Sequence, residues 1–288
     1  MNISGKTKLL CVIGDPIEHT MSPKMHNTAI EELGLDYAYV AFHVTPDKLD
    51  KAVEGFRSLQ IAGINVTIPH KIEIMRYLDE IDPVARGIGA INTIKNDNGK
   101  LIAKNTDAEG AMKAIQEAGI DASGARVSML GCGGAARAII FSLAKEKAKV
   151  DLLVRKADLD DAESLVNDVK GTFPSVDFPI LEMTDEALKE SLASSSLLVN
   201  ATPVGMYPNS DVSLIKEEML HESLSVFDVV YNPLETKLLK QAMKVGSKVV
   251  HGIDMLVYQG ALAFEWWTGH EPPVASMKKA AVEALGLK

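Results

Sequence analysis

Residues 126–138 read RVSMLGCGGAARA, in which an apolar run leads into a glycine-rich turn and then into small residues with helical spacing. The spacing Gly131-x-Gly133-x-x-Ala136, between a strand and a helix, is typical of a turn that binds a dinucleotide. The first glycine permits the tight turn, the second lets the backbone approach a pyrophosphate, and the small third residue lets the helix pack closely on the strand. The plainer alternative is a glycine-rich connection without a ligand. We predict the dinucleotide, held by the free N–H groups of the helix N-terminus.

The chain around this turn alternates between strand and helix patterns. A helix is expected from Asp107 to about Gly119, and further strands are expected at residues 150–154, 196–200, 226–230 and 248–251. Strands separated by helices form parallel βαβ units, so this part of the chain is predicted to be a doubly wound sheet.

The N-terminal third also reads as mixed α/β. Strands are expected at residues 8–14, 37–44 and 63–67, with a helix opened by Ser22-Pro23. Residues 90–95 and 100–105 flank Asn96-Asp97-Asn98-Gly99, which indicates a hairpin. Residues after Asp254 read as helical.

A length of 288 residues favours two domains. We expect one domain to comprise residues 1–106 and 255–288, and the other to comprise residues 107–254. The C-terminal helices would then return to the first domain. Such an arrangement leaves a cleft, and clefts between domains are favoured sites for small ligands.

The composition excludes several functional classes. The formal net charge is −9, and an acidic surface repels phosphate backbones, so no nucleic-acid partner is expected. No apolar run reaches the roughly 20 residues that a membrane span needs. The histidines show no metal-ligand spacing, so no metal is expected. Cys11 and Cys132 are too few for a disulfide framework and suit a reducing cytoplasm.

The end of the second expected strand indicates which dinucleotide is bound. An NAD site usually has an acidic residue there, which accepts hydrogen bonds from the ribose 2′-OH. Asp151 begins that strand, whereas Arg155 and Lys156 follow its end. Two cations suit a 2′-phosphate, because arginine grips it with a planar fork. The alternative is a pair of solvated basic residues on a loop, and we predict NADP.

Polar residues gather at the ends of the N-terminal strands, where sites for small molecules form in such sheets. Each also has a plain structural reading, such as a helix cap for Ser22 or Asp107, or a solvated loop residue for Lys71. The set comprises Thr20, Ser22, Asn65, Thr67, Lys71, Asn92, Asn105, Thr106 and Asp107.

Taken together and in order, eight motifs of the chain resemble the shikimate dehydrogenase family, over nearly the whole length. They are GDPIEHTMSP (14–23), NVTIPHK (65–71), GAINT (89–93), NTD (105–107), GCGGAARA (131–138), NATPVGM (200–206), DVVYNP (228–233) and DMLVYQGA (254–261). The family reduces 3-dehydroshikimate to shikimate with NADPH, on the route to aromatic amino acids. The resemblance implies a substrate domain joined to a Rossmann-like NADP domain. A monomer and a homodimer are both left open.

The resemblance also implies roles for individual residues. Lys71 and Asp107 would be the catalytic pair, which suits the chemistry, because an ammonium stabilises the negative charge that develops on a ketone oxygen during hydride transfer. Thr20 and Ser22 would hold the substrate carboxylate. The ring hydroxyls would be held by Thr67, Asn92, Asp107 and Gln259, and Tyr231 would lie on the substrate side. The cofactor would be held by Gly131, Gly133, Gly134, Ala135, Arg155, Lys156, Thr202, Gly252 and Met255.

The chain departs from the family pattern at Thr20, where the family usually has serine, at 154–156, where Val-Arg-Lys replaces Asn-Arg-Thr, and at Cys132, which replaces alanine. The methyl group of Thr20 narrows the substrate pocket, which leaves open a quinate/shikimate dehydrogenase that also uses NAD. A dinucleotide-binding regulator without turnover is the alternative from another class. Such a regulator would have no need of the Lys71–Asp107 pair.

Overall fold

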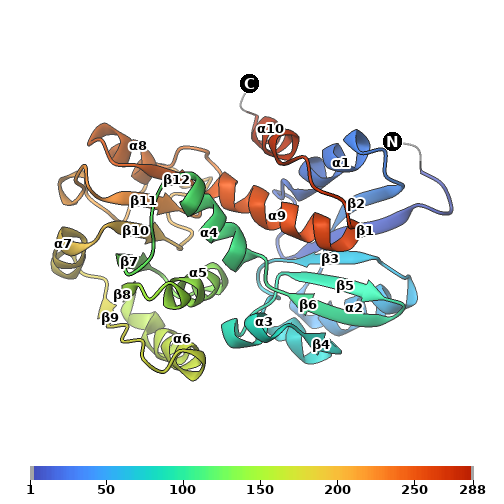
Figure 1. Ribbon diagram of the computed structural model, residues 1–288, viewed down its shortest axis with the longest axis horizontal. Helices are drawn as coiled ribbons and strands as arrows, with labels where there is room; N and C mark the ends of the chain where they lie inside the picture. The colour runs from blue at the N-terminus through green and yellow to red at the C-terminus, as the bar shows by residue number, and fades with distance from the viewer. Residues whose placement is uncertain (1–2, 287–288) are drawn as a thin grey trace. The chain divides into compact units, whose positions relative to one another are not determined.

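The computed structural model describes residues 3–286 and divides into two compact units. The first unit comprises residues 1–106 and 257–288, and the second comprises residues 107–256 (Figure 1). The sequence placed these boundaries at 106/107 and 254/255. Helix α9 (Gly252–Thr268) begins in the second unit and ends in the first.

The second unit contains a six-stranded parallel sheet in the order β12-β11-β10-β7-β8-β9. This order confirms the predicted doubly wound fold, since the strands run outward on both sides of β7 and β10. Its elements are α4 (Asp107–Glu117), β7 (Arg126–Leu130), α5 (Gly134–Lys145), β8 (Lys149–Val154), η3 (Lys156–Asp158), α6 (Leu159–Thr172), β9 (Ile180–Glu182), α7 (Asp185–Ser194), β10 (Leu197–Asn200), η4 (Glu217–Met219), β11 (Ser225–Asp228), α8 (Lys237–Lys244) and β12 (Val249–His251).

Helices cover this sheet because its strands are apolar on both faces, as buried parallel strands must be. Leu188 and Leu192 of α7 pack in one core cluster with Leu238 and Leu239 of α8 and with residues of β10 and β11. Helices α4 and α5 pack against each other (Figure 1). The carboxyl ends of the strands are therefore left as the edge where a ligand site can form.

The first unit contains a mixed six-stranded sheet in the order β2-β1-β3-β5-β6-β4. Strands β1, β2 and β3 are parallel, whereas β5 is antiparallel to both β3 and β6. Its elements are β1 (Lys8–Gly14), α1 (Ser22–Glu32), β2 (Tyr37–His43), η1 (Pro46–Lys48), α2 (Leu49–Ser58), β3 (Gly63–Val66), η2 (Glu73–Tyr77), β4 (Glu80–Ile81), α3 (Pro83–Ile88), β5 (Thr93–Asp97), β6 (Lys100–Lys104), part of α9, and α10 (Val274–Ala284).

Both faces of the first sheet are covered. Val53 and Phe56 of α2 pack in a core cluster with Cys11 and Ile13 of β1. Helices α1 and α10 lie side by side (Figure 1). Near the end of α9, the Trp267 Nε1 donates a hydrogen bond to the Ile94 carbonyl at 2.9 Å, which fixes the end of α9 on the sheet.

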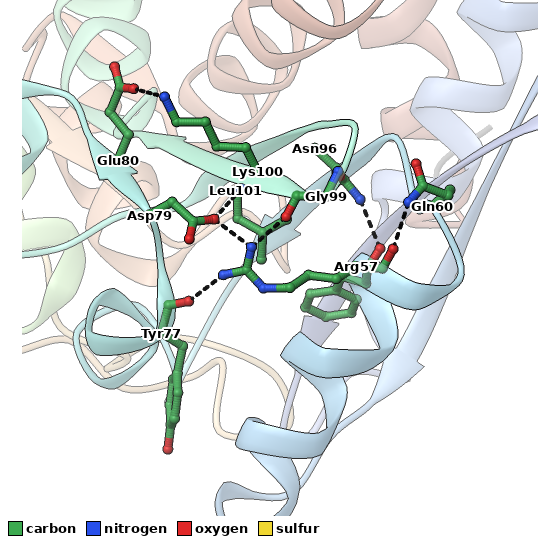
Figure 2. A network of polar contacts seen from close by, with 10 residues as sticks. Arg57, Gln60, Tyr77, Asp79, Glu80, Asn96, Gly99, Lys100 and Leu101 are labelled. Carbon is green, nitrogen blue, oxygen red and sulfur yellow. Dashed lines mark hydrogen bonds and ion pairs between the residues drawn. The ribbon is translucent and has the colours of Figure 1, made fainter.

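A polar network holds the outer part of this unit together (Figure 2). The Arg57 guanidinium, at the end of α2, donates to the carbonyls of Tyr77 and Gly99 and to the Asp79 carboxylate. Asp79 also accepts a hydrogen bond from the Leu101 N–H at 2.7 Å. Arg57 thus joins α2, the segment after η2 and the β5–β6 hairpin. That hairpin turns at Asn98 and Gly99, which both have positive φ angles (53° and 94°), as the predicted turn requires.

Two local features differ from the sequence predictions. The hydroxyl of Ser22 does not cap α1, because Ser22 is already the first helical residue and Met21 stands at the N-cap without a side-chain bond. The segment from η2 to α3 was not predicted, although Asp82 caps α3 by accepting hydrogen bonds from Val84 and Ala85. Within residues 3–286, no helix is long and apolar enough to cross a membrane.

Candidate active site

Buried polar side chains meet at the strand ends of the first unit. The Tyr39 hydroxyl on β2 donates to Asn65 Oδ1 on β3 at 2.6 Å. Asn65 Nδ2 in turn donates to the Asn92 carbonyl and to Thr93 Oγ1, both at 3.2 Å. Burial raises the pKa of Tyr39 well above its ordinary value, so this hydroxyl remains a proton donor. The backbone carbonyl of Asn92 can only accept, which fixes the orientation of the Asn65 amide.

Asn92 lies at the centre of this group. Its Nδ2 donates to Thr106 Oγ1 at 2.9 Å and to Gln259 Oε1 at 3.2 Å. Its Oδ1 accepts the Thr106 N–H at 2.7 Å. The network joins β5, the end of β6 and helix α9, although Gln259 is 167 positions from Asn92 in the sequence. The structure therefore brings together two of the predicted substrate residues, Asn92 and Gln259.

The backbone of Lys71 lies beside the same segment, since the Ile91 N–H donates to the Lys71 carbonyl at 2.9 Å. On the other side, Asn92 N–H donates to the Lys104 carbonyl at 3.2 Å, and Asn105 Nδ2 donates to the Ala90 carbonyl at 2.9 Å. Asp107, the first residue of α4, is buried and directly follows Thr106. Two chain segments that carry the predicted catalytic pair thus flank residues 90–92.

The predicted carboxylate-binding residues lie at the start of α1. Ser22 is buried, and its N–H donates to Thr20 Oγ1 at 3.3 Å. Thr67, after β3, packs against the end of β1. A Cβ at Gly14 would lie 2.5 Å from Thr67 Cγ2, so only glycine fits at position 14. Thr20 and Thr67 are both half-buried.

The glycine-rich turn of the second unit has the geometry that a dinucleotide site requires. Gly131 has a φ angle of +92°, and a Cβ there would lie 2.9 Å from Thr202 Cγ2. Helix α5 begins at Gly134, with half-buried Ala135 next and fully buried Ala136 facing the core. A Cβ at Gly133 would face open space, so the backbone there is approachable. These residues fit a pyrophosphate.

At the end of β8, Arg155 is exposed and forms an ion pair with Asp158, with Nε 2.6 Å from Oδ2. Lys156 follows as the first residue of η3. Asp151 is buried and accepts a hydrogen bond from the Ser191 hydroxyl at 2.8 Å. Asp151 is therefore engaged inside the fold. That Arg155 and Lys156 bind a 2′-phosphate stays a prediction.

The other predicted cofactor residues lie near the carboxyl ends of β10, β11 and β12. Thr202 follows β10 and is held by Asn200, whose Oδ1 accepts from the Thr202 N–H and hydroxyl at 3.1 and 2.7 Å. A Cβ at Gly252 would lie 2.4 Å from the Val229 carbonyl, so the close approach of α9 to β11 requires glycine. Met255 is buried one turn further along α9. Tyr231, after β11, is half-buried, and burial raises the pKa of its hydroxyl.

Sequence reasoning missed several residues that support the site. Tyr39 was read only as a strand residue, and Thr93 only as part of a strand and a motif, yet both bind the side chain of Asn65. Asp228 was noted only within a motif, yet it is fully buried beside Asn200. Cys132 is half-buried in the turn, and burial raises the pKa of its thiol. The described residues contain no group of three or more side chains suited to a metal ion.

The chain is similar to known proteins over nearly its whole length. Residues 12–94 match the family described as the shikimate dehydrogenase substrate binding domain, and residues 252–282 match the shikimate 5′-dehydrogenase C-terminal domain. The shikimate dehydrogenase (NADP(+)) of Methanocaldococcus jannaschii is 45% identical over 284 residues, covering 98% of this chain and 99% of the relative.

Solved structures are similar over the same length. A crystal structure of a shikimate dehydrogenase in complex with NADP+ is 44% identical, with a TM-score of 0.89, and the match covers 98% of this chain and 97% of that one. The shikimate 5-dehydrogenase of Listeria monocytogenes, in complex with shikimate and NAD, is 40% identical, with a TM-score of 0.90 and coverage of 97% and 98%.

Proposed function

This chain belongs to the shikimate dehydrogenase family and catalyses the NADPH-dependent reduction of 3-dehydroshikimate to shikimate, and from that premise we propose how its residues divide the work. The reaction is a step of aromatic amino acid biosynthesis. The observation that carries the assignment of roles is the buried network around Asn92, which gathers neutral donors and acceptors beside the backbone of Lys71. Residues 1–106 and 255–288 form the substrate domain, and residues 107–254 form the NADP domain.

The substrate is a ring with one carboxylate and several hydroxyls. Thr20 and Ser22 hold the carboxylate with their hydroxyls. The ring hydroxyls are held by Thr67, Asn92, Asp107 and Gln259, and Tyr231 lies on the substrate side. Hydroxyl and amide groups suit this task because they both donate and accept hydrogen bonds. An analogue that lacks one hydroxyl leaves a buried polar group without a partner, and the site rejects it for that reason.

Lys71 and Asp107 act on the reacting carbonyl. The Lys71 ammonium donates a hydrogen bond to the ketone oxygen, stabilises the negative charge that develops there, and supplies the proton that makes the alcohol. The Asp107 carboxylate orients the ammonium and accepts a hydrogen bond from the neighbouring hydroxyl. In the reverse direction, Lys71 takes the proton back from the alcohol.

When bound, NADPH would supply the hydride for the reduction, and NADP+ would accept it in the reverse direction. Gly131, Gly133, Gly134 and Ala135 hold its pyrophosphate through the turn and the N-terminus of α5. Arg155 and Lys156 hold the 2′-phosphate. Thr202, Gly252 and Met255 hold the nicotinamide half.

The test is the absorbance of reduced nicotinamide after the purified protein is mixed with shikimate or quinate and with NADP or NAD. Rapid reduction with NADP and shikimate alone supports the roles given to Thr20 and Arg155. Strong activity with quinate or with NAD would leave the proposed mechanism unchanged. It would assign the chain to a branch of the family with dual specificity. If neither NADP nor NAD is reduced in any mixture although the protein binds cofactor and substrate, the proposed enzymatic activity would be contradicted.

We place the enzyme in the cytoplasm, because both cysteines are free and Cys11 is a buried thiol of the core. We propose a monomer or a homodimer, since the chain carries both a substrate unit and a cofactor unit of its own. Sedimentation of the purified protein measures which of the two is formed.

A further inference from the structure

Asp228 is the last residue of β11, and its side chain is fully buried. Three neutral groups donate to its carboxylate: Thr236 Oγ1 at 2.6 Å, Asn200 Nδ2 at 3.0 Å and the Val230 N–H at 3.1 Å. Burial raises the pKa of this carboxyl to about 6, although the three hydrogen bonds lower it. Burying a carboxylate that is paired only with neutral donors costs free energy of folding. The hydrogen bonds of Asp228 connect it to two loops, those that follow β10 and β11.

On one side, Asp228 orients the amide of Asn200, its register partner at the end of β10. A carboxylate only accepts, so it draws the Nδ2 of Asn200 toward itself and turns the Oδ1 of Asn200 toward Thr202. That Oδ1 accepts both the N–H and the hydroxyl of Thr202, and the Nδ2 also donates to the Val204 carbonyl at 3.3 Å. The conformation of the loop at 201–206 therefore depends on the direction of one amide.

On the other side, Asp228 holds the segment that follows β11. Its two oxygens accept the Val230 N–H and the hydroxyl of Thr236, which caps α8. The two loops are also joined directly, since the Tyr207 N–H donates to the Asn232 carbonyl at 2.9 Å. Asp228 is thus hydrogen-bonded to the ends of two neighbouring loops, those that follow β10 and β11, at the carboxyl edge of the sheet.

Both loops contact the predicted cofactor residues. Thr202 lies against Gly131, where an added Cβ would come within 2.9 Å of its methyl group. The Val229 carbonyl lies against Gly252, where an added Cβ would come within 2.4 Å. Asp228 acts on Thr202 through Asn200. It acts on Gly252 through Val230, whose N–H it accepts and whose carbonyl oxygen would lie 2.6 Å from the same added Cβ.

We propose that Asp228 is a positioning residue for NADP, which acts through Asn200 and Val230 to set the loops that meet Gly131 and Gly252. The proposal rests on the cofactor roles assigned above to Gly131, Thr202 and Gly252. Asparagine can replace this aspartate in part, because its single oxygen can accept from Asn200 and Val230 while its NH2 group donates to Thr236. Alanine replaces none of the three bonds.

The experiment measures NADP and NAD affinity by calorimetry, and the KM of shikimate, in Asp228→Ala, Asp228→Asn and Thr236→Val. The Kd of NADP should rise about tenfold or more in Asp228→Ala, with the KM of shikimate within threefold of the wild type. Asp228→Asn should restore the Kd to within about threefold. Thr236→Val is the matched control, since it removes one bond to the carboxylate but leaves the one to Asn200, and its Kd should stay near the wild-type value.

The loss of affinity should be similar for NADP and NAD. The affected turn at Gly131 binds the part that the two cofactors share, whereas Arg155 binds the 2′-phosphate of NADP alone. If Asp228→Ala does not fold, Asn200→Ala tests the same route, and its loss of affinity should equal that expected of Asp228→Ala. A lower melting temperature with unchanged Kd values in these variants would overturn the proposal. Because binding is measured directly, this failure is distinct from an absence of turnover in the wild type.

Discussion

The Arg155 guanidinium holds the Asp158 carboxylate in a two-point ion pair, with Nε 2.6 Å from Oδ2 and Nη2 2.9 Å from Oδ1. The pair raises the pKa of Arg155 and lowers that of Asp158, chiefly through these hydrogen bonds. The carboxylate takes one edge of the planar fork and leaves Nη1 outside the pair. Arg155 is therefore held at the end of β8 in one orientation. We expect it to bind a 2′-phosphate through the edge of the guanidinium that carries Nη1.

Arg155→Ala should raise the KM of NADP at least tenfold and the KM of NAD less than threefold, because only NADP carries the phosphate that the fork binds. Initial rates with each cofactor at saturating shikimate measure the two effects. Lys149→Ala is the control, since this exposed lysine begins the same strand at its opposite end. Equal losses for both cofactors would show that Arg155 does not read the 2′-phosphate.

Lys71→Ala and Asp107→Ala should each lower kcat about 10²- to 10⁴-fold, which is the usual contribution of a positioned acid or base. The Kd of NADP should change little in either variant, because neither residue is assigned to the cofactor. Single-turnover absorbance and calorimetry separate the two quantities. Unchanged turnover in one variant would remove that residue from the mechanism.

Arg57→Ala should lower the free energy of unfolding by about 1–3 kcal/mol, because it leaves the half-buried carbonyls of Tyr77 and Gly99, and the exposed Asp79 carboxylate, without their donor (Figure 2). Lys100→Ala is the control in the same region. Its ion pair with Glu80 is exposed on both sides and is screened by water, so its loss should have little effect. Urea unfolding of both variants provides the comparison, and equal midpoints would contradict the stabilising role of Arg57.

The sequence predicted the doubly wound sheet because the evidence for it is local. The turn at 131–136 and the alternation of strands with helices can be read within short windows. The polar residues Asn65 and Asn92 near strand ends were also predicted. So was the position of Arg155 and Lys156 directly after β8. The Arg155–Asp158 pair was visible as a spacing of three residues but was not read.

The remaining parts depend on contacts that no local pattern shows. The bond from Asn92 to Gln259 joins residues 167 positions apart, and only the family resemblance pointed to Gln259. Tyr39 looks like any aromatic residue of a strand until its hydroxyl is seen on Asn65. Asp228 was noted only within the expected strand at 226–230 and within a motif, whereas the structure shows it buried with three donors at the end of β11.

We expect His26 to make the stability of the protein depend on pH. Its ring is fully buried, stacks on Tyr39 with centroids 4.3 Å apart, and neither ring nitrogen has a hydrogen-bond partner among the residues that the structure describes. Burial lowers the pKa of His26 from 6.5 to about 3. Above pH 6.5 both the folded and the unfolded states hold a neutral ring, so the histidine has no effect on the pH dependence.

Below pH 6.5 the unfolded chain binds a proton that the folded protein does not, so the free energy of unfolding falls with falling pH. The slope from this one group is about 1.4 kcal/mol per pH unit, until the pH nears the folded pKa. His26→Phe should remove that slope between pH 6 and about 4.5, whether or not the larger ring lowers stability at every pH. His270→Phe, at an exposed position of the same unit, should keep the wild-type slope. Urea unfolding across this range measures the difference, and parallel curves for His26→Phe and the wild type would show that His26 is protonated within the folded protein.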